Sequence, residues 1–258
     1  MKRTMIVVLT VAVAITMTAC DALDSMLNYN LFASLAAVSP KEIAKADAAT
    51  LVKLSASDSF YSTLATDPTL KESSLKKIEE AMSADPPSSS NYQELAVLAA
   101  NIHLQTTAAG DFINNVSGLM VDLIDESAPD FSDLERIIGG LVPGSIKSSD
   151  GSINKASFLA MITALEEADN AYRDLGLAIG SGAYASGADI VPGEVAQNAL
   201  IAAIVATVVP PSGTRGEYLY ALLTNPATPD PDSTVFPSFP DMETGYLGNI
   251  LSAANISF

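Results

Sequence analysis

Residues 154–179 read NKASFLAMITALEEADNAYRDLGLAI, and this stretch decides the fold class of the chain. Its large apolar side chains recur every three or four positions, which is the period of one face of an α-helix. The stripe consists of Phe158, Ile162, Leu165, Tyr172, Leu175 and Ile179. A helix of this length with one continuous apolar face must pack against several others, so the segment predicts the central helix of a larger helical assembly.

The same periodicity continues on both sides of this segment, whereas the apolar/polar alternation of a β-strand is not found. The sequence therefore predicts an all-α fold, either an irregular helical bundle or a short array of helix pairs. Proline, glycine and capping residues punctuate the apolar stripes and set the expected bounds. The expected helices are 40–54, 73–84, 91–107, 108–125, 132–141, 154–179, 192–209, 215–224 and 242–254.

The helix expected at 192–209 is apolar almost all round over residues 199–209 and stops at Pro210 and Pro211. This run is shorter than the roughly 20 residues needed to cross a bilayer. It therefore predicts a buried core helix. Residues 40–211 are expected to form the helical domain, and residues 212–258 a C-terminal helix, a proline-rich strap and a closing helix.

The N-terminus has the three parts of an export signal: two basic residues, an apolar run, and small residues before the sole cysteine, Cys20. Met17-Thr18-Ala19-Cys20 resembles the lipobox of bacterial lipoprotein precursors, although that family usually has leucine where this chain has Met17. The resemblance implies a signal peptide at 1–19 and a diacylated Cys20 that starts a tether at 20–39. Lipidation gives the lone cysteine a purpose, since acyl chains anchor a soluble domain to a membrane. Asp21 favours retention at the inner membrane by the same resemblance.

The net charge of −17 argues against nucleic acid as a partner, because binding to phosphates requires basic side chains. The acidic residues are unevenly placed: from Glu79 to Glu135 no lysine or arginine occurs. Such a field keeps a protein soluble and can attract a cationic partner.

A second resemblance, to tetratricopeptide repeats, covers about residues 74–115. The matching positions are Ile78, Ala81 and Pro86 in one unit and Tyr92, Leu95, Ala96, Ala108 and Phe112 in the next. Together with the lipid tether, this layout resembles the repeat-containing lipoproteins that accompany TRAP-type solute transporters. The resemblance implies a helical groove and a solute-binding protein as partner, and it identifies no catalytic residue.

Motifs for catalysis or metal binding are incomplete. Residues 148–154 resemble the middle of an EF-hand loop but lack both terminal carboxylates. Residues 180–185 fit the dinucleotide-binding glycine pattern but follow a helix instead of a strand, which predicts an interhelical loop. Glu166 and Glu167 point about 100° apart on a helix, so a solvated face is expected for them. No catalytic residue, metal site or cofactor is predicted.

The expected activity is therefore binding. A groove beside Tyr92 and His103, the only histidine, is the first candidate surface, and Phe236 and Phe239 of the proline-rich segment are the second. The protein is expected to be a non-catalytic envelope lipoprotein, on the periplasmic side of a membrane or on the cell surface, that binds another envelope protein. The alternative is a carrier that encloses a small apolar ligand.

Overall fold

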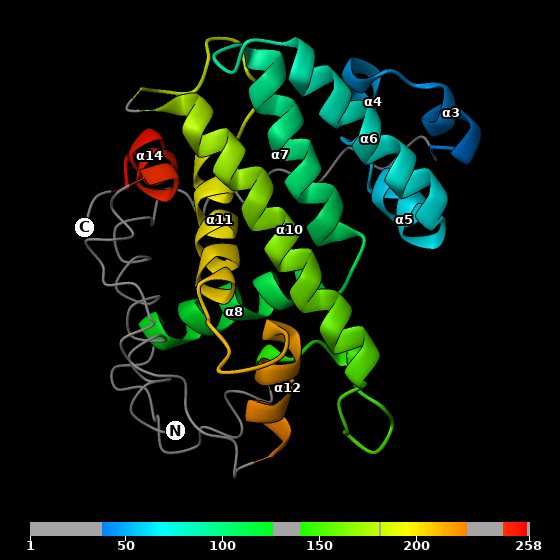
Figure 1. Cartoon of the computed structure of the whole chain (residues 1–258), viewed down its shortest axis with the longest axis vertical. Helices are drawn as coiled ribbons and strands as arrows, with labels where there is room; N and C mark the ends of the chain where they lie inside the picture. Colours follow the sequence, from blue (N-terminus) through cyan, green and yellow to red (C-terminus); the bar gives the residue numbers. More distant parts are fainter. Residues whose placement is uncertain (1–37, 126–139, 181, 226–244, 257–258) are drawn as a thin grey trace.

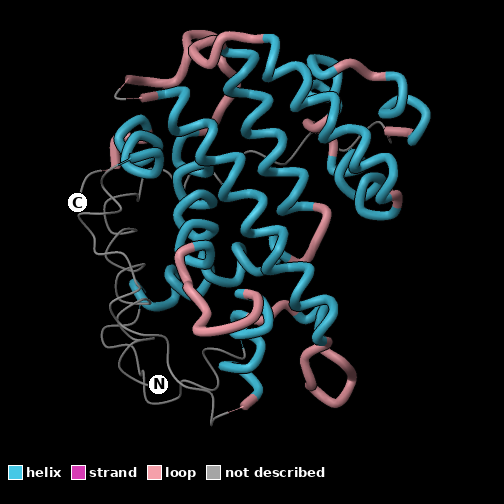
Figure 2. The backbone as a smooth tube through the Cα atoms, in the orientation of Figure 1, coloured by secondary structure: helices cyan, strands magenta, loops and turns pink. Residues whose placement is uncertain are grey.

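The structure is a computed structural model, and it describes residues 38–125, 140–180, 182–225 and 245–256. Within these residues the chain forms ten α-helices and one short 3-10 helix, with no β-strand. Figure 1 shows other helices gathered around the long helix α10, and Figure 2 shows that loops and turns connect them. The predicted all-α fold is confirmed.

The quoted stretch forms the central helix, α10 (Lys155–Ile179). The Asn154 side chain accepts a hydrogen bond from the Ser157 amide at 3.0 Å and so caps its start. The six apolar residues of the predicted stripe are all buried. Helix α10 packs against α7, α11, α12, α14 and α8, and the prediction of its central position is therefore confirmed.

Helix α11 (Pro192–Ala206) runs beside α10 (Figure 1). Most of its residues between Val195 and Val205 are buried, on every side of the helix. Helix α11 also packs against α14 (Gly245–Ala253). The all-round apolarity of this segment correctly predicted a core helix.

Helices α6 (Pro68–Ala84) and α7 (Ser90–Gln105) form a neighbouring pair on the other side of α10. Helix α7 supplies residues to two hydrophobic clusters. Ala96, Ala100 and Leu104 lie in the cluster around α10, whereas Leu95 and Ile102 lie in a second cluster under α6. Helix α7 thus connects the N-terminal helices to the rest of the core.

The second cluster is completed by α3 (Pro40–Lys45), α4 (Ala48–Leu54) and α5 (Asp58–Thr66). The expected single helix at 40–54 is wrong, because the chain breaks after Lys45. The Asp47 side chain accepts the Thr50 amide at 2.8 Å and starts a new helix, and Lys77 of α6 donates to the carbonyls of Ala44 and Ala46 at the break.

Two further differences concern α5 and α6. Helix α5 was not expected. Helix α6 begins at Pro68, five residues earlier than expected, since Asp67 caps it by accepting the Leu70 amide at 3.0 Å. Most of the expected helix at 132–141 lies outside the described residues.

The remaining elements close one end of the molecule: α8 (Ala109–Asp125), the 3-10 helix η1 (Gly144–Ile146) and α12 (Arg215–Thr224). Helix α12 has the predicted bounds. Among the described residues, none of the helices has both the length and the apolar character needed to cross a bilayer.

Candidate functional site

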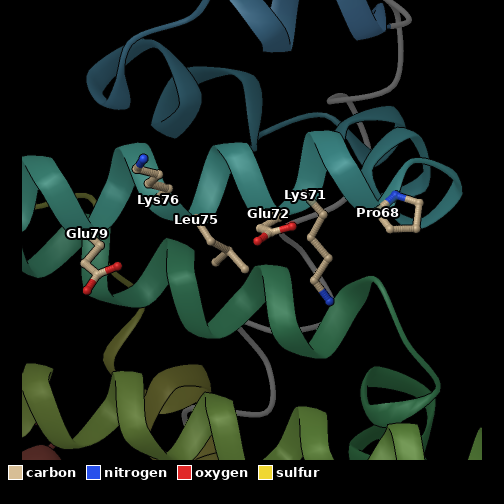
Figure 3. A pocket seen from close by; sticks show the side chains of 6 residues that line it. All are labelled: Pro68, Lys71, Glu72, Leu75, Lys76 and Glu79. Carbon is tan, nitrogen blue, oxygen red and sulfur yellow. The ribbon is translucent and has the colours of Figure 1, made fainter.

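The exposed side of α6 carries a shallow hollow of about 450 Å³. Its lining comes from one helix: Pro68, Lys71, Glu72, Leu75, Lys76 and Glu79. Figure 3 shows Lys71, Leu75 and Glu79 pointing from α6 toward α7, whereas Lys76 points away from α7. Leu75 is partly buried against the cluster under α6. The α6 hollow therefore has an apolar centre and a rim with charges of both signs.

His103 of α7 lies beside one end of this hollow, within electrostatic reach of Lys71. Burial, and to a lesser extent the Lys71 ammonium group, lowers the pKa of His103 to about 4. Burial also lowers the pKa of Lys71. His103 is consequently neutral at physiological pH. Of the two neighbours His103 and Lys71, only Lys71 therefore carries a positive charge.

Tyr92 occupies the same face of α7 as His103 but lies about 16 Å away along the helix axis, because eleven residues separate them. Burial, and then the Asp174 carboxylate of α10, raises the pKa of Tyr92. The charged neighbour of Tyr92 is thus Asp174 of α10, whereas that of His103 is Lys71 of α6. The structure places these two predicted residues on one helix, although they do not share one pocket.

The other predicted positions, Cys20, Phe236 and Phe239, lie outside the described residues. The incomplete motifs take structural positions. The Glu166 carboxylate pairs with Arg215, whose Nε donates to the Val208 carbonyl at 2.7 Å, so Glu166 fastens α12 to α10 instead of lying on a solvated face. Glu167 is exposed, as expected.

The two motif-like loops are also accounted for by local structure. In residues 148–154, the Asp150 carboxylate accepts hydrogen bonds from the amide and hydroxyl of Ser152, at 2.9 and 2.6 Å. Residues 180–185 connect α10 to α11, which confirms the expected interhelical loop. Among the described residues, no group of three histidine, cysteine or acidic side chains is placed to hold a metal ion.

A second region, which the sequence analysis missed, lies inside the molecule around Tyr172 of α10. Its centre is the Tyr172 hydroxyl, which is fully buried. Burial is the main reason that the pKa of Tyr172 is raised; the Asn198 amide opposes the shift, and Glu194, Tyr184 and Tyr61 increase it. We name Tyr61, Tyr172, Tyr184 and Glu194 the tyrosine cluster.

The members of the tyrosine cluster are held by different elements. Burial raises the pKa of Tyr61 to about 12, with Ser55 and Asn101 as hydrogen-bonding neighbours that oppose the shift. Burial likewise raises the pKa values of Tyr184 and Glu194. All three phenols are therefore neutral at physiological pH. The sequence analysis could not predict this region. Its residues lie in four separate segments, and no spacing pattern relates them.

A third polar group fastens α14 to α10. The buried Asp169 carboxylate accepts from the Tyr246 hydroxyl and from Arg173 at 3.2 Å, and the Arg173 guanidinium lies 4.4 Å from the centre of the Tyr246 ring. The Asn249 amide donates to the Gly176 carbonyl at 2.9 Å. Every polar atom named here has a partner, so we interpret this group as stabilising the packing of α14 on α10.

Comparison with known proteins adds no relative: the chain matches no protein-family model, no curated protein and no solved structure.

Proposed function

We propose that this protein is a lipid-anchored, non-catalytic binding module of the bacterial cell envelope, and that the α6 hollow binds another envelope protein. The anchor is the diacylated Cys20, following the export signal at 1–19. The resemblance to transporter-associated lipoproteins makes a solute-binding protein the first candidate partner.

The observation that carries this proposal is the composition of the α6 hollow. Protein interfaces combine a desolvated apolar centre with a polar rim, and here Leu75 is surrounded by Lys71, Glu72, Lys76 and Glu79. Charges of both signs favour a partner whose own surface presents a complementary pattern, because complementary charges set orientation and association rate. The neutral His103 at one end adds a partly buried polar contact.

The acidic stretch that starts at Glu79 provides long-range attraction for a partner with a basic surface. Binding that depends on these exposed charges should weaken as salt rises, since the Debye length is only about 8 Å at physiological ionic strength.

The anchor and the interface can be tested in the same cells. Replacement Cys20→Ser should move the protein from the membrane fraction to the soluble fraction. A photo-crosslinking residue in place of Lys76 should form an adduct with one envelope protein, and that adduct should disappear in the Lys71→Glu background. A photo-crosslinking residue in place of Lys53, an exposed lysine at the end of α4, is the matched control.

Retention of the Cys20→Ser protein in the membrane fraction would refute the anchor. Equal adducts from positions 76 and 53, or no adduct from either, would refute the interface on α6.

A further inference from the structure

The lining of the α6 hollow contains three side chains that follow one another at every fourth position: Lys71, Leu75 and Glu79. All three point to the same side of α6, toward α7 (Figure 3). Successive members lie about 6 Å apart along the helix axis, because four helical residues rise by that distance. We name these three residues the α6 row. It has a positive charge at one end, an apolar side chain in the middle and a negative charge at the other end.

The α6 row is accessible to another molecule. Lys71 and Leu75 are partly exposed, and Glu79 is exposed. Among the described residues, no ion pair includes Lys71 or Glu79, whereas the neighbouring Lys76 is paired with Glu80 of the same helix at 3.9 Å. The charges at the two ends of the α6 row can therefore pair with charges on a partner.

The α6 row is complementary to itself when it is turned around. If two copies of α6 pack antiparallel with Leu75 against Leu75, each Lys71 lies opposite Glu79 of the second copy. Residues four apart form ridges on a helix surface, and packing of such ridges from two helices is the commonest class in globular proteins. An interface with two-fold symmetry requires this kind of self-complementarity. Leu75 also lies next to the middle of α6 (Pro68–Ala84), so the contact is centred on the helix.

The distribution of charge along the chain favours the same face. The net charge is −17, so two copies repel each other in most orientations. Residues 38–84, which include α3 to α6, contain six lysines and seven acidic residues, whereas the residues after 84 contain five basic and twenty-one acidic ones. Helices α3 to α6 are thus nearly neutral as a group, and repulsion between two copies is weakest where these helices face each other.

We propose that the partner of the α6 hollow is a second copy of this chain, docked antiparallel through the α6 row. This inference rests on the proposed function, because it names the envelope protein that occupies the hollow. The resemblance to transporter-associated lipoproteins suggested a solute-binding protein, whereas the α6 row itself fits a second copy.

The contact is expected to be weak in dilute solution, since its centre is one pair of leucines and its ion pairs are exposed. Anchoring both copies to one membrane through Cys20 raises their local concentration and so favours the pair. The test therefore uses the purified full-length lipoprotein in phosphatidylcholine vesicles, where a second copy is the only protein partner present. A photo-crosslinking residue in place of Lys76 should give an adduct of twice the chain mass, and the same residue in place of Lys53 should not.

Charge reversal at the ends of the α6 row tests the antiparallel geometry. Lys71→Glu gives a row with two negative ends and Glu79→Lys a row with two positive ends, so the adduct yield of each variant alone should fall by about fivefold or more. An equimolar mixture of the two variants should recover most of the wild-type yield, because both ion pairs form between unlike copies. The double variant Lys71→Glu/Glu79→Lys should recover it too. Lys53→Glu is the matched control, since it makes the same charge change at an exposed lysine outside the row.

No adduct of twice the chain mass in vesicles would overturn the proposal, as would unchanged yields in both single variants or no recovery in their mixture. The mixture also controls for folding, since it contains the same two chains that fail alone. Crosslinking in cells separates this inference from the proposed function. An adduct only with a different envelope protein keeps the proposed function and overturns the second copy as partner, whereas no adduct from position 76 in cells or in vesicles overturns both.

Discussion

The backbone of α14 lies very close to Gly176 of α10, and replacement of this glycine by alanine tests how α14 is held. A Cβ atom at Gly176 would lie 2.7 Å from the carbonyl carbon of Tyr246 and 2.9 Å from its Cα, with the carbonyl oxygen closer still. All three atoms belong to the backbone, so no rotamer change relieves the collision. Helix α14 must move away from α10.

The expected cost follows from three contributions. Overpacking of a close contact costs about 1–3 kcal/mol. Alanine is a better helix former than glycine by about 1 kcal/mol, which offsets part of that cost. Complete detachment of α14 would expose the buried Leu247, Ile250 and Leu251, at about 1.5–3 kcal/mol each, so the helix should shift and stay bound. The expected net loss is about 1–2 kcal/mol.

Thermal unfolding followed by circular dichroism measures this loss, and the midpoint of Gly176→Ala should fall by roughly 2–8 °C. The control is Gly118→Ala, in the interior of α8, where an added Cβ meets nothing within 4 Å. That variant should be as stable as wild type or more stable by up to about 1 kcal/mol. If Gly176→Ala unfolds at or above the wild-type midpoint, the close packing of α14 on α10 is wrong.

Three further predictions concern charge and anchoring. His103 has a folded pKa of about 4 against 6.5 for the free side chain, so the unfolded state binds more protons between these values and stability should fall as the pH is lowered from 6.5 to 4, by up to about 3 kcal/mol. His103→Gln should flatten this part of a pH series of denaturant unfolding curves; an unchanged slope would contradict the burial of His103. Arg215→Ala should cost about 1–2 kcal/mol because it unpairs the partly buried Glu166, and a double-mutant cycle with Glu166→Gln should give a coupling of about 1 kcal/mol; simple additivity would contradict a working pair. Metabolic labelling with a radioactive fatty acid should mark the wild type and leave Cys20→Ser unlabelled, and label in both would place the acyl chain elsewhere.

Helices with clear end signals, α10 and α12 among them, were predictable from the sequence. Helix α10 has a stripe of six buried residues and a capping Asn154, and α12 has Thr214 accepting the Glu217 amide at its start. In such segments local preference and tertiary packing agree. Their bounds are therefore set by residues within the segment itself.

The short helices α3, α4 and α5 were poorly predicted, since few of their residues are buried in the core. Helix α5 buries only Phe60 and Leu64, one turn apart, and the rest of the segment is polar or small. Between α3 and α4 the deciding interactions are Asp47 with Thr50 and the contact of Lys77 with the end of α3, of which the second spans more than thirty residues. The periodicity of apolar residues contains neither interaction, so it predicted one helix at 40–54 in place of α3 and α4.

The candidate sites depended even more on contacts distant in sequence. All residues that line the α6 hollow lie on one helix. A sequence prediction that started α6 at Pro68 would therefore have placed them on that helix together. The tyrosine cluster brings together Tyr61 of α5 and Glu194 of α11, and no sequence pattern relates them. The repeat resemblance directed attention to Tyr92 and His103, which share a helix face but have different neighbours.

A pattern of hydrophobic residues cannot predict which polar side chains are buried. In this structure, hydrogen-bond partners explain why several polar side chains can be buried. Gln93, Ser74 and Asp169 are each no more than 2% exposed. Gln93 accepts from the Ala185 amide, Ser74 donates to the Leu70 carbonyl at 2.8 Å, and Asp169 binds Arg173. A buried polar side chain needs a hydrogen-bond partner, and these three residues have one. The buried hydroxyls of Tyr172 and Tyr184 have none among the described residues, so they differ from the other buried polar groups.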